Sequence, residues 1–443
     1  MRRLIGRLAG TDHRHLLQGS AVLVVGAAVQ AVGGGLFWLI AARSQSADDV
    51  GVSTALFTSV LFVSYATGLG LTVAVARYAA GRDRDSHTVF GWAIAATTLA
   101  AGLGAAIYVT LIDAEATATI RDEGLLGWVV FAALVIGSSF SLIVDVRWMT
   151  QRKWSYVLAR ITITGLIRFP LLLLVPDSSI GWWLFIFAMT PTSVSGLIGV
   201  LTLPRVTGAR HRLRPRPSTA RSAVRYSLVN YASTLAYQAP SFALPVIVLV
   251  HVDSDVNASF YVAWGITAIA FYVPMAIGQA LLAEGGKQGS SLAGQVRLAL
   301  TLAVGLLTIA TAGAWLIRDI VVSVYGEEYR EAGEILPMLV GAGIPWAITS
   351  VYLTEARVRH QHAATVLITL VLSLGVLVPA LILVPSDGLD GAAVSYLIGN
   401  LLAAAVAAAS HFVGRNRPVP PDIVDPDFLD ALTPTDLAAS TAN

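Results

Sequence analysis

The chain has 443 residues, of which 56% are hydrophobic and only 13% are charged, and its mean hydropathy is +0.71. Soluble domains carry about 25% charged residues, so this composition excludes a soluble globular protein and indicates an integral membrane protein. The absence of cysteine excludes disulfides, thiolate metal sites and a cysteine nucleophile, whereas the net charge of +2 says little because the distribution of charge carries the information.

The N-terminal segment 1–16 is basic and is followed by an apolar run from Leu17 to Ala42. A cleaved signal peptide has a shorter apolar region of roughly 7–15 residues. This run reaches the roughly 20 residues that a helix needs to cross a bilayer. We therefore predict that it is the first transmembrane helix and stays in the mature protein.

Apolar runs of spanning length recur along the rest of the chain. They are too long and too evenly apolar to be the short alternating strands of a membrane barrel. We therefore predict an all-α integral membrane protein with twelve transmembrane helices. The predicted spans are 17–42, 50–75, 89–111, 124–146, 155–175, 180–203, 226–250, 258–282, 298–316, 335–354, 363–384 and 392–413.

Lysine and arginine predict the orientation of these spans. Of the 29 such residues, 23 fall in segments on the same side as the N-terminus, and two lie inside the fifth span. The remaining four, on the opposite side, are Arg43, Arg121, Arg318 and Arg330. Positive residues concentrate on the cytoplasmic side of membrane proteins, so we predict that both termini are cytoplasmic.

The longest basic segment, 204–225, joins the sixth and seventh spans. We interpret it as an orientation-setting linker; a patch for anionic lipid or nucleic acid is the alternative. The tail after residue 413 contains several prolines and aspartates, and its composition is typical of a disordered segment. The predicted organisation is a cytoplasmic segment 1–16, an N-lobe 17–203, a linker 204–225, a C-lobe 226–413 and a disordered cytoplasmic tail 414–443.

A weak internal repeat supports the division into two lobes. A shift of 207 residues brings Asp48 onto Asp255 and Gly51 onto Ala258, and it also aligns the pattern of spans. Because six spans return the chain to its starting side, the two halves form a parallel pseudo-repeat. Two such lobes around a central cavity are a common plan for transporters.

Motifs of catalysis are missing from the sequence. It contains no G-x-x-x-x-G-K-[ST] phosphate loop, no G-x-S-x-G and no H-E-x-x-H. His360 and His362 flank Gln361 in a predicted loop, a pattern more typical of a solvated pair than of a metal site. The longest predicted loop on the outer side, around 317–334, is short for a catalytic domain. We therefore predict no enzyme activity and no cofactor, and leave the identity of any coupling ion open.

The fifth span carries two arginines at membrane depth. Arg160, Thr164 and Arg168 recur every four residues and so lie along one side of a helix. A central arginine costs roughly 2.5–3.5 kcal/mol on insertion scales, and such residues usually face the bundle interior or a water-filled cavity. Arginine pairs well with phosphate, so we predict a binding surface for an anionic substrate. Snorkelling of the side chains to the cytoplasmic surface is the alternative, and it is harder for Arg168 than for Arg160.

Acidic residues lie at the cytoplasmic ends of the spans and not near their centres. Asp145, Glu284 and Glu355 are at the ends of the fourth, eighth and tenth spans, where each can form an interfacial salt bridge. Arg77 and Glu284 occupy corresponding positions of the repeat. We therefore consider Arg77, Glu284 and Asp145 as candidates for an inner gate across the cleft.

Polar side chains also interrupt the first and seventh spans. Asn230, Tyr237 and Gln238 lie in the seventh span, and Gln30 lies in the first. Such residues are tolerated in a membrane where they line a cavity or contact a neighbouring helix. They are candidates for the translocation pathway, although ordinary helix packing explains them equally well.

Two stretches resemble a known family. The segment "VGVSTALFTSVLFVSYATGLGLTVAVARYAAG" resembles the second-helix region of polysaccharide and O-antigen flippases, members of the multidrug/oligosaccharidyl-lipid/polysaccharide exporter superfamily. The segment "VVSVYGEEYREAGEILPMLVGAGIP", with Gly326, Tyr329, Ala332 and Leu336, resembles their region between the ninth and tenth helices. The resemblance implies a bacterial inner-membrane flippase that moves a lipid-linked oligosaccharide from the cytoplasmic to the outer leaflet by alternating access.

Three other functions compete with a flippase. A multidrug exporter of the same superfamily typically has an acidic pocket for organic cations, whereas this sequence places arginine at depth. A major-facilitator transporter typically has G-x-x-x-D-R-x-G-R-R after its second span, where this chain reads "ARYAAGRDRDSHT". A non-transporting scaffold of glycan assembly does not explain Arg168. The expected partners are the lipid-linked glycan, membrane lipids and a glycan polymerase or glycosyltransferases, without nucleic acid.

Overall fold

The computed structural model describes most of the apolar part of the chain. The described residues are 26, 29–30, 32–68, 71, 75, 84–151, 153–176, 178–207, 235–284, 292–359 and 361–414. All regular structure within these residues is helical, and no strand is found among them. Eight helical segments of this part are long and apolar enough to cross a membrane. The chain is therefore a multi-pass helical membrane protein.

Each of the twelve predicted spans coincides with helix in the described residues. The first is helical over residues 32–44, and the seventh over Leu235–His251. The other N-terminal helices are α3 (Ala47–Ala66), α5 (Arg84–Leu111), α6 (Glu115–Asp122), α7 (Gly124–Thr150), α8 (Trp154–Leu166), α9 (Arg168–Leu172) and α10 (Ile180–Thr207). The other C-terminal elements are α12 (Ser254–Glu284), α13 (Leu292–Tyr325), the 3₁₀ turn η1 (Glu327–Tyr329), α14 (Arg330–Gly341), α15 (Gly343–Val358) and α16 (His362–Gly414).

Several predicted boundaries were wrong. Helix α13 continues to Tyr325, so most of the predicted outer loop around 317–334 is helical. The short helix α6 was not predicted, and α10 extends to Thr207, inside the predicted linker. The eleventh and twelfth spans form one element, α16, that is broken at Gly388, whose φ of 56° lies in the left-handed region that favours glycine.

Two spans break at a proline. Helix α8 ends at Leu166, four residues before Pro170, and α14 ends at Gly341, four residues before Pro345. A proline has no N–H to donate to the carbonyl four residues earlier, and its ring clashes with that carbonyl. Both breaks therefore fall where the sequence removes a helical hydrogen bond, and the first break places Arg168 at the start of α9.

The starts of the helices confirm a parallel repeat. Helices α3 and α12 begin at residues 47 and 254, which are 207 positions apart, the shift that the sequence suggested. Helices α8 and α16 begin 208 positions apart, at residues 154 and 362. The two halves thus follow the same order of elements.

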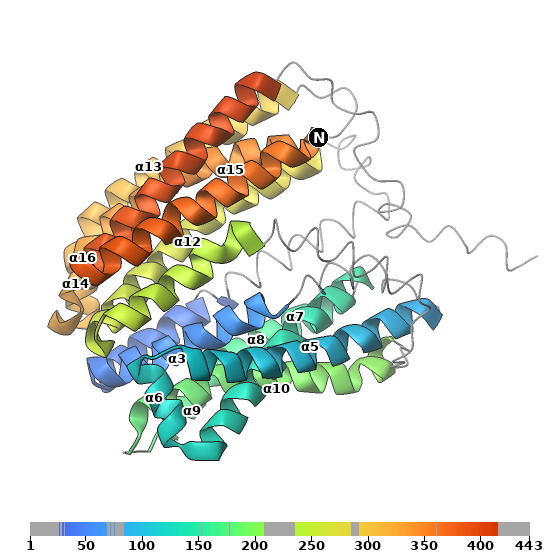
Figure 1. Cartoon of the computed structure of the whole chain (residues 1–443), viewed down its shortest axis with the longest axis vertical. Coiled ribbons are helices and arrows are strands. Elements are labelled where there is room, and N and C mark those ends of the chain that lie inside the picture. The colour runs from blue at the N-terminus through green and yellow to red at the C-terminus, as the bar shows by residue number, and fades with distance from the viewer. Residues whose placement is uncertain are drawn as a thin grey trace, which may run out of the picture.

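Figure 1 shows the two halves as separate groups of helices, the N-lobe from blue to green and the C-lobe from yellow to red. We use these names for the described helices up to Thr207 and from Leu235 onward. Helix α3 packs against α12, and a hydrophobic core that includes Phe37, Trp38 and Phe260 extends across both lobes. This packing holds the lobes together at one end and positions the site between them.

Hydrogen bonds between the lobes mark that end, which we call the closed end. The Arg43 guanidinium donates to the carbonyl oxygens of Ser323 and Val324. Ser254 donates to a carboxylate oxygen of Glu115 at 2.6 Å.

The backbones themselves meet at the closed end. The side-chain amide of Asn257 donates to the Gly51 carbonyl at 3.2 Å. A Cβ atom added to Gly51 would lie 1.7 Å from the Ser254 carbonyl oxygen. No side chain larger than hydrogen fits at residue 51 unless the lobes separate.

Candidate functional site

A cavity of about 830 Å³ lies between the two lobes. Its walls come from the first span, α3, α7, α8, α9 and α10 of the N-lobe and from the seventh span, α12 and α13 of the C-lobe. Five of the residues predicted from the sequence line it, namely Gln30, Asp145, Arg160, Arg168 and Gln238. Residues that are far apart in the chain therefore meet in one space, as a translocation site requires.

Among the described residues, Arg168 is a buried cation without a carboxylate partner. Only 7% of the residue is exposed, and Nη2 donates to the Thr192 hydroxyl at 3.0 Å. Its Nε has no hydrogen-bond partner within the part of the chain that the structure describes. Among the described residues, the titratable group that acts on it electrostatically is the Tyr261 phenol, not an acid. An arginine has five N–H donors, so this guanidinium keeps unused capacity for an anion.

Aromatic rings surround Arg168. The guanidinium carbon lies 6.0 Å from the centre of the Phe57 ring. Trp38 packs edge-on against Phe57 at 5.7 Å and against Tyr261 at 5.3 Å. Since Tyr261 belongs to α12 and the other two rings to the N-lobe, this cluster joins the two lobes in the cavity wall. Aromatic faces stabilise a cation that has left water, which partly offsets the burial of Arg168.

Arg160 differs from Arg168 because it has an acidic partner. Its Nε donates to Asp145 Oδ1 at 2.7 Å, and its Nη2 donates to Asp145 Oδ2. Nη1 donates to the Ser195 hydroxyl at 3.3 Å. Arg160 does not snorkel to the surface, since its side chain is only 8% exposed. Asp145 forms a salt bridge, as expected, and Arg160 is its partner; its expected position at the membrane interface stays a prediction.

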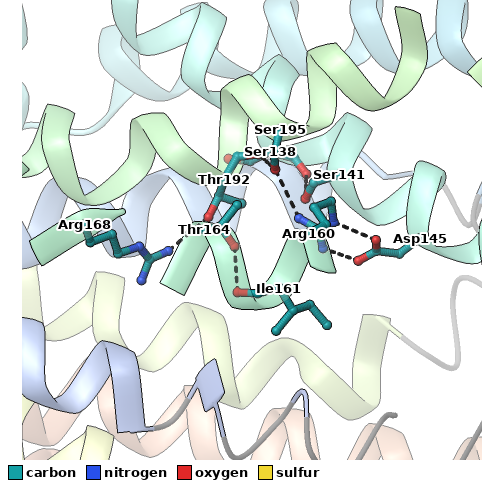
Figure 2. A network of polar contacts seen from close by, with 9 residues as sticks. All are labelled: Ser138, Ser141, Asp145, Arg160, Ile161, Thr164, Arg168, Thr192 and Ser195. Atoms are coloured by element: carbon teal, nitrogen blue, oxygen red, sulfur yellow. Dashed lines mark hydrogen bonds and ion pairs between the residues drawn. The ribbon is translucent and has the colours of Figure 1, made fainter. Parts of the chain in front are cut away.

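Figure 2 shows how the two arginines relate to α10. Arg168 reaches Thr192 and Arg160 reaches Ser195, and these two residues are three apart on the same helix. Thr164 was predicted to share their surface. Thr164 is only 4% exposed, and its hydroxyl donates to the Ile161 carbonyl at 3.1 Å. It is not among the residues that line the cavity.

The remaining predicted residues lie elsewhere. Tyr237 does not line the cavity and packs 5.7 Å from the guanidinium of Arg357 within the C-lobe. Asn230, Arg77 and the side chain of Glu284 fall outside the described residues, so their predicted roles stay predictions.

The third acidic candidate of the sequence also forms an ion pair, away from the cavity. Glu355 is 2% exposed, accepts from Arg359 Nε at 2.8 Å and contacts His411 Nδ1 at 2.6 Å. Among the described residues, no group of histidine and acidic side chains is arranged to hold a metal ion.

Several residues at or beside the cavity were not predicted from the sequence. Thr192 in the cavity wall and Ser195, a partner of Arg160, belong to the polar stretch "TPTSVSG" of the sixth span, a signal that was available. The stacked pair Tyr65 and Phe242, with ring centres 4.6 Å apart, comes from opposite lobes. Its members look like ordinary core aromatics in the sequence, so only the fold reveals their place.

Comparisons with known proteins identify solved structures that share the fold. No protein-family profile matches the chain, and no curated protein matches its sequence. Among solved structures, the lipid II flippase MurJ in an inward closed conformation is 11% identical, covering 92% of this chain and 89% of its own, with a TM-score of 0.70. A multidrug resistance MATE transporter in an inward-facing conformation is 15% identical, covering 87% and 94%, with a TM-score of 0.66.

The chain has the fold of the MOP superfamily transporters. An outward-facing MATE structure with 17% identity, covering 92% and 96%, gives the lower TM-score of 0.58. This fold agrees with the superfamily that the sequence resembled. The branch within the superfamily, and with it the substrate, is not decided by similarities of this kind, because the same fold is found in a lipid flippase and in drug transporters.

Proposed function

We propose that the chain is a flippase for a lipid-linked oligosaccharide. The observation that carries this proposal is Arg168, a guanidinium buried in the cavity wall with no acidic partner among the described residues. A buried charge without a partner is costly, so an anionic substrate that supplies the missing charge explains its presence. The diphosphate of a polyprenyl-linked glycan is such a group, and guanidinium binds phosphate oxygens with two parallel hydrogen bonds.

The proposed transport is alternating access across the bacterial inner membrane, with both termini in the cytoplasm. In this orientation the closed end faces outward, and the cavity receives substrate from the cytoplasmic side. The glycan occupies the cavity while the lipid chain stays in the bilayer. The proposed lobes are 17–203 and 226–413, joined by the basic linker 204–225. Energy comes from an ion gradient, the membrane potential or the substrate gradient, and a glycan polymerase or glycosyltransferases are the expected partners.

The test is Arg168→Gln. It removes the charge and keeps a polar side chain, so transport of the glycan lipid should fall at least tenfold, since a hydrogen bond to a charged group contributes about 1.5–3 kcal/mol. Arg168→Lys should retain part of the activity because lysine keeps the charge but not the fork. The measurement is the appearance of glycan on the outer leaflet, normalised to the amount of protein in the membrane.

Arg318→Gln is the matched control. Arg318 lies on α13, is partly exposed and stacks on Trp315 at 4.6 Å, outside the cavity. It should transport like the unmodified protein. Wild-type transport by Arg168→Gln, with the variant present at normal levels, would overturn the assignment of the phosphate site.

Export of organic cations is the second candidate, and Asp145 is the observation that favours it. This carboxylate lines the same cavity, and most of the neighbouring lining is aromatic or aliphatic, as a lipophilic cation requires. In this structure, however, Asp145 is engaged by Arg160. Deletion of the gene separates the candidates: loss of surface glycan with retained lipid-linked precursor supports the flippase, whereas normal glycan with increased sensitivity to cationic drugs supports the exporter.

A further inference from the structure

The Asp145–Arg160 ion pair occupies the edge of the Arg160 guanidinium that carries Nε and Nη2. Both carboxylate oxygens of Asp145 are engaged, one by Nε and one by Nη2 of the guanidinium. This is the fork-to-fork geometry in which arginine also binds a phosphate group. A phosphate and Asp145 therefore compete for the same donors, and Arg160 is not available to a substrate while the pair is closed.

The position of the pair places this competition next to Arg168. Arg160 and Arg168 are eight residues apart, but their guanidinium groups reach Ser195 and Thr192 on one turn of α10. The Cβ atoms of residues three apart on a helix lie roughly 5–6 Å from each other, so the hydroxyl-bearing residues that the two guanidinium groups reach are neighbours on α10. Two adjacent phosphates of one ligand can bridge such a separation, and a single phosphate on Arg168 cannot.

The pair joins two helices that are consecutive in the chain. Asp145 is on α7 and Arg160 on α8, and α8 begins at Trp154, a short turn after α7 ends at Thr150. The chain connection already keeps the two helices adjacent. Both side chains also line the cavity, with exposures of 13% for Asp145 and 8% for Arg160, so a ligand in the cavity can reach them.

We propose that Asp145 is a built-in substitute for the second phosphate of the substrate. The first phosphate binds Arg168; the second displaces the Asp145 carboxylate and binds Arg160. This proposal rests on the proposed function, because it requires a substrate with two adjacent phosphates. It makes Asp145 a specificity residue: ligands with one phosphate leave the ion pair closed, and only a diphosphate opens it.

The test is the binding of two soluble probes, farnesyl diphosphate and farnesyl monophosphate, to the purified full-length protein in detergent, measured by titration calorimetry. The unmodified protein should bind the diphosphate at least threefold more tightly, because its second phosphate gains Arg160; the gain is modest because that phosphate must first displace Asp145. Asp145→Asn removes the competing charge. It should tighten diphosphate binding by about tenfold or more, the effect of one charge-assisted contact, and leave monophosphate binding within about twofold.

The double variant Asp145→Asn with Arg160→Gln is the matched control. It removes both charges and leaves two amide groups that can hydrogen-bond to each other, so the preference for the diphosphate should disappear. If Asp145→Asn does not fold, the preference for the diphosphate in the double variant, compared with the unmodified protein, tests the proposal. An unchanged preference in the double variant, or no preference in the unmodified protein, would overturn the proposal.

Arg168→Gln separates failure of this proposal from failure of the proposed function. If both probes bind the unmodified protein and lose affinity in Arg168→Gln, but Asp145→Asn binds the diphosphate no more tightly, only the role of Asp145 is wrong. If neither probe binds the unmodified protein better than Arg168→Gln, the anion site and the proposal built on it both fail.

Discussion

Two arginines on one span have different surroundings, and this difference gives the site its chemistry. Arg160 is neutralised by Asp145, whereas Arg168 has one hydroxyl partner and aromatic neighbours. A guanidinium that lacks an acidic partner attracts an anion more strongly than one that is already paired. The charge available to a substrate in this conformation is therefore that of Arg168.

The Thr192 hydroxyl should matter for stability more than for recognition. Thr192→Val keeps the shape of the side chain and removes the hydrogen-bond acceptor of Arg168. We expect a loss of about 1–3 kcal/mol, because a buried donor is left unsatisfied, and a lower melting temperature of the purified protein. An added anion should restore more stability in this variant than in the unmodified protein.

Thr202→Val is the control for this prediction. Thr202 lies on the same helix, and its hydroxyl donates to the Ile198 carbonyl within that helix. Its replacement should leave the melting temperature nearly unchanged. Equal melting temperatures for the two variants would show that the bond to Arg168 contributes little.

At the scale of elements, Pro170 determines where Arg168 points. The break between α8 and α9 follows from this proline, and Arg168 is the first residue after the break. A continuous helix would turn Arg168 by a different angle relative to Arg160. The proline therefore serves the geometry of the site as well as the course of the span.

Pro170→Ala should restore the helical hydrogen bond to the Leu166 carbonyl and straighten the span. We expect binding of farnesyl monophosphate to weaken several-fold while the melting temperature stays equal or rises, because helix continuity is favourable. Pro345→Ala repairs the break between α14 and α15 in the C-lobe, far from Arg168 in the chain, and should leave binding unchanged. A weakened affinity in both variants would indicate a general loss of structure.

The spans were predictable from the sequence, and the site was predictable only in part. Long apolar runs must be helical in a bilayer, so the positions of these runs located the spans. The break at Ile167 was not predicted although Pro170 is visible in "IRFPLLLL", because the hydropathy of a span does not depend on a single helical hydrogen bond. Asp145 and Arg160 are fifteen residues apart, and their pairing depends on how α7 and α8 pack.

At the scale of the whole molecule, the closed end holds the lobes together by close approach. Gly51 lies against the backbone of Ser254, and its carbonyl accepts from Asn257. A transporter that alternates must separate these surfaces in its other state. The contact at Gly51 is therefore a sensitive point for the balance between the two states.

Gly51→Val should shift the protein toward opening at the closed end. Its side chain would overlap the Ser254 carbonyl, which disfavours the closed arrangement. The chain has no cysteine, so a single Gly265→Cys in the cavity wall reports access without background. A membrane-impermeant maleimide added from outside should label this cysteine faster in the Gly51→Val background.

Gly305→Ala is the control, because an added Cβ at Gly305 meets open space. Its labelling should equal that of Gly265→Cys alone. Equal labelling of the Gly51→Val background would show that this contact does not limit opening, or that the closed end faces the cytoplasm. Labelling from the cytoplasmic side of inverted vesicles distinguishes these two outcomes.

Three hydrogen bonds of the closed end have main-chain acceptors, the carbonyls of Gly51, Ser323 and Val324, and their donors are the side chains of Arg43 and Asn257. A mutation cannot delete a carbonyl of the backbone. A genetic screen for variants that open more readily should therefore recover substitutions at Arg43 and Asn257, but none that act by removing their acceptors. Natural substitutions can therefore remove the donors of these three hydrogen bonds but not their backbone acceptors.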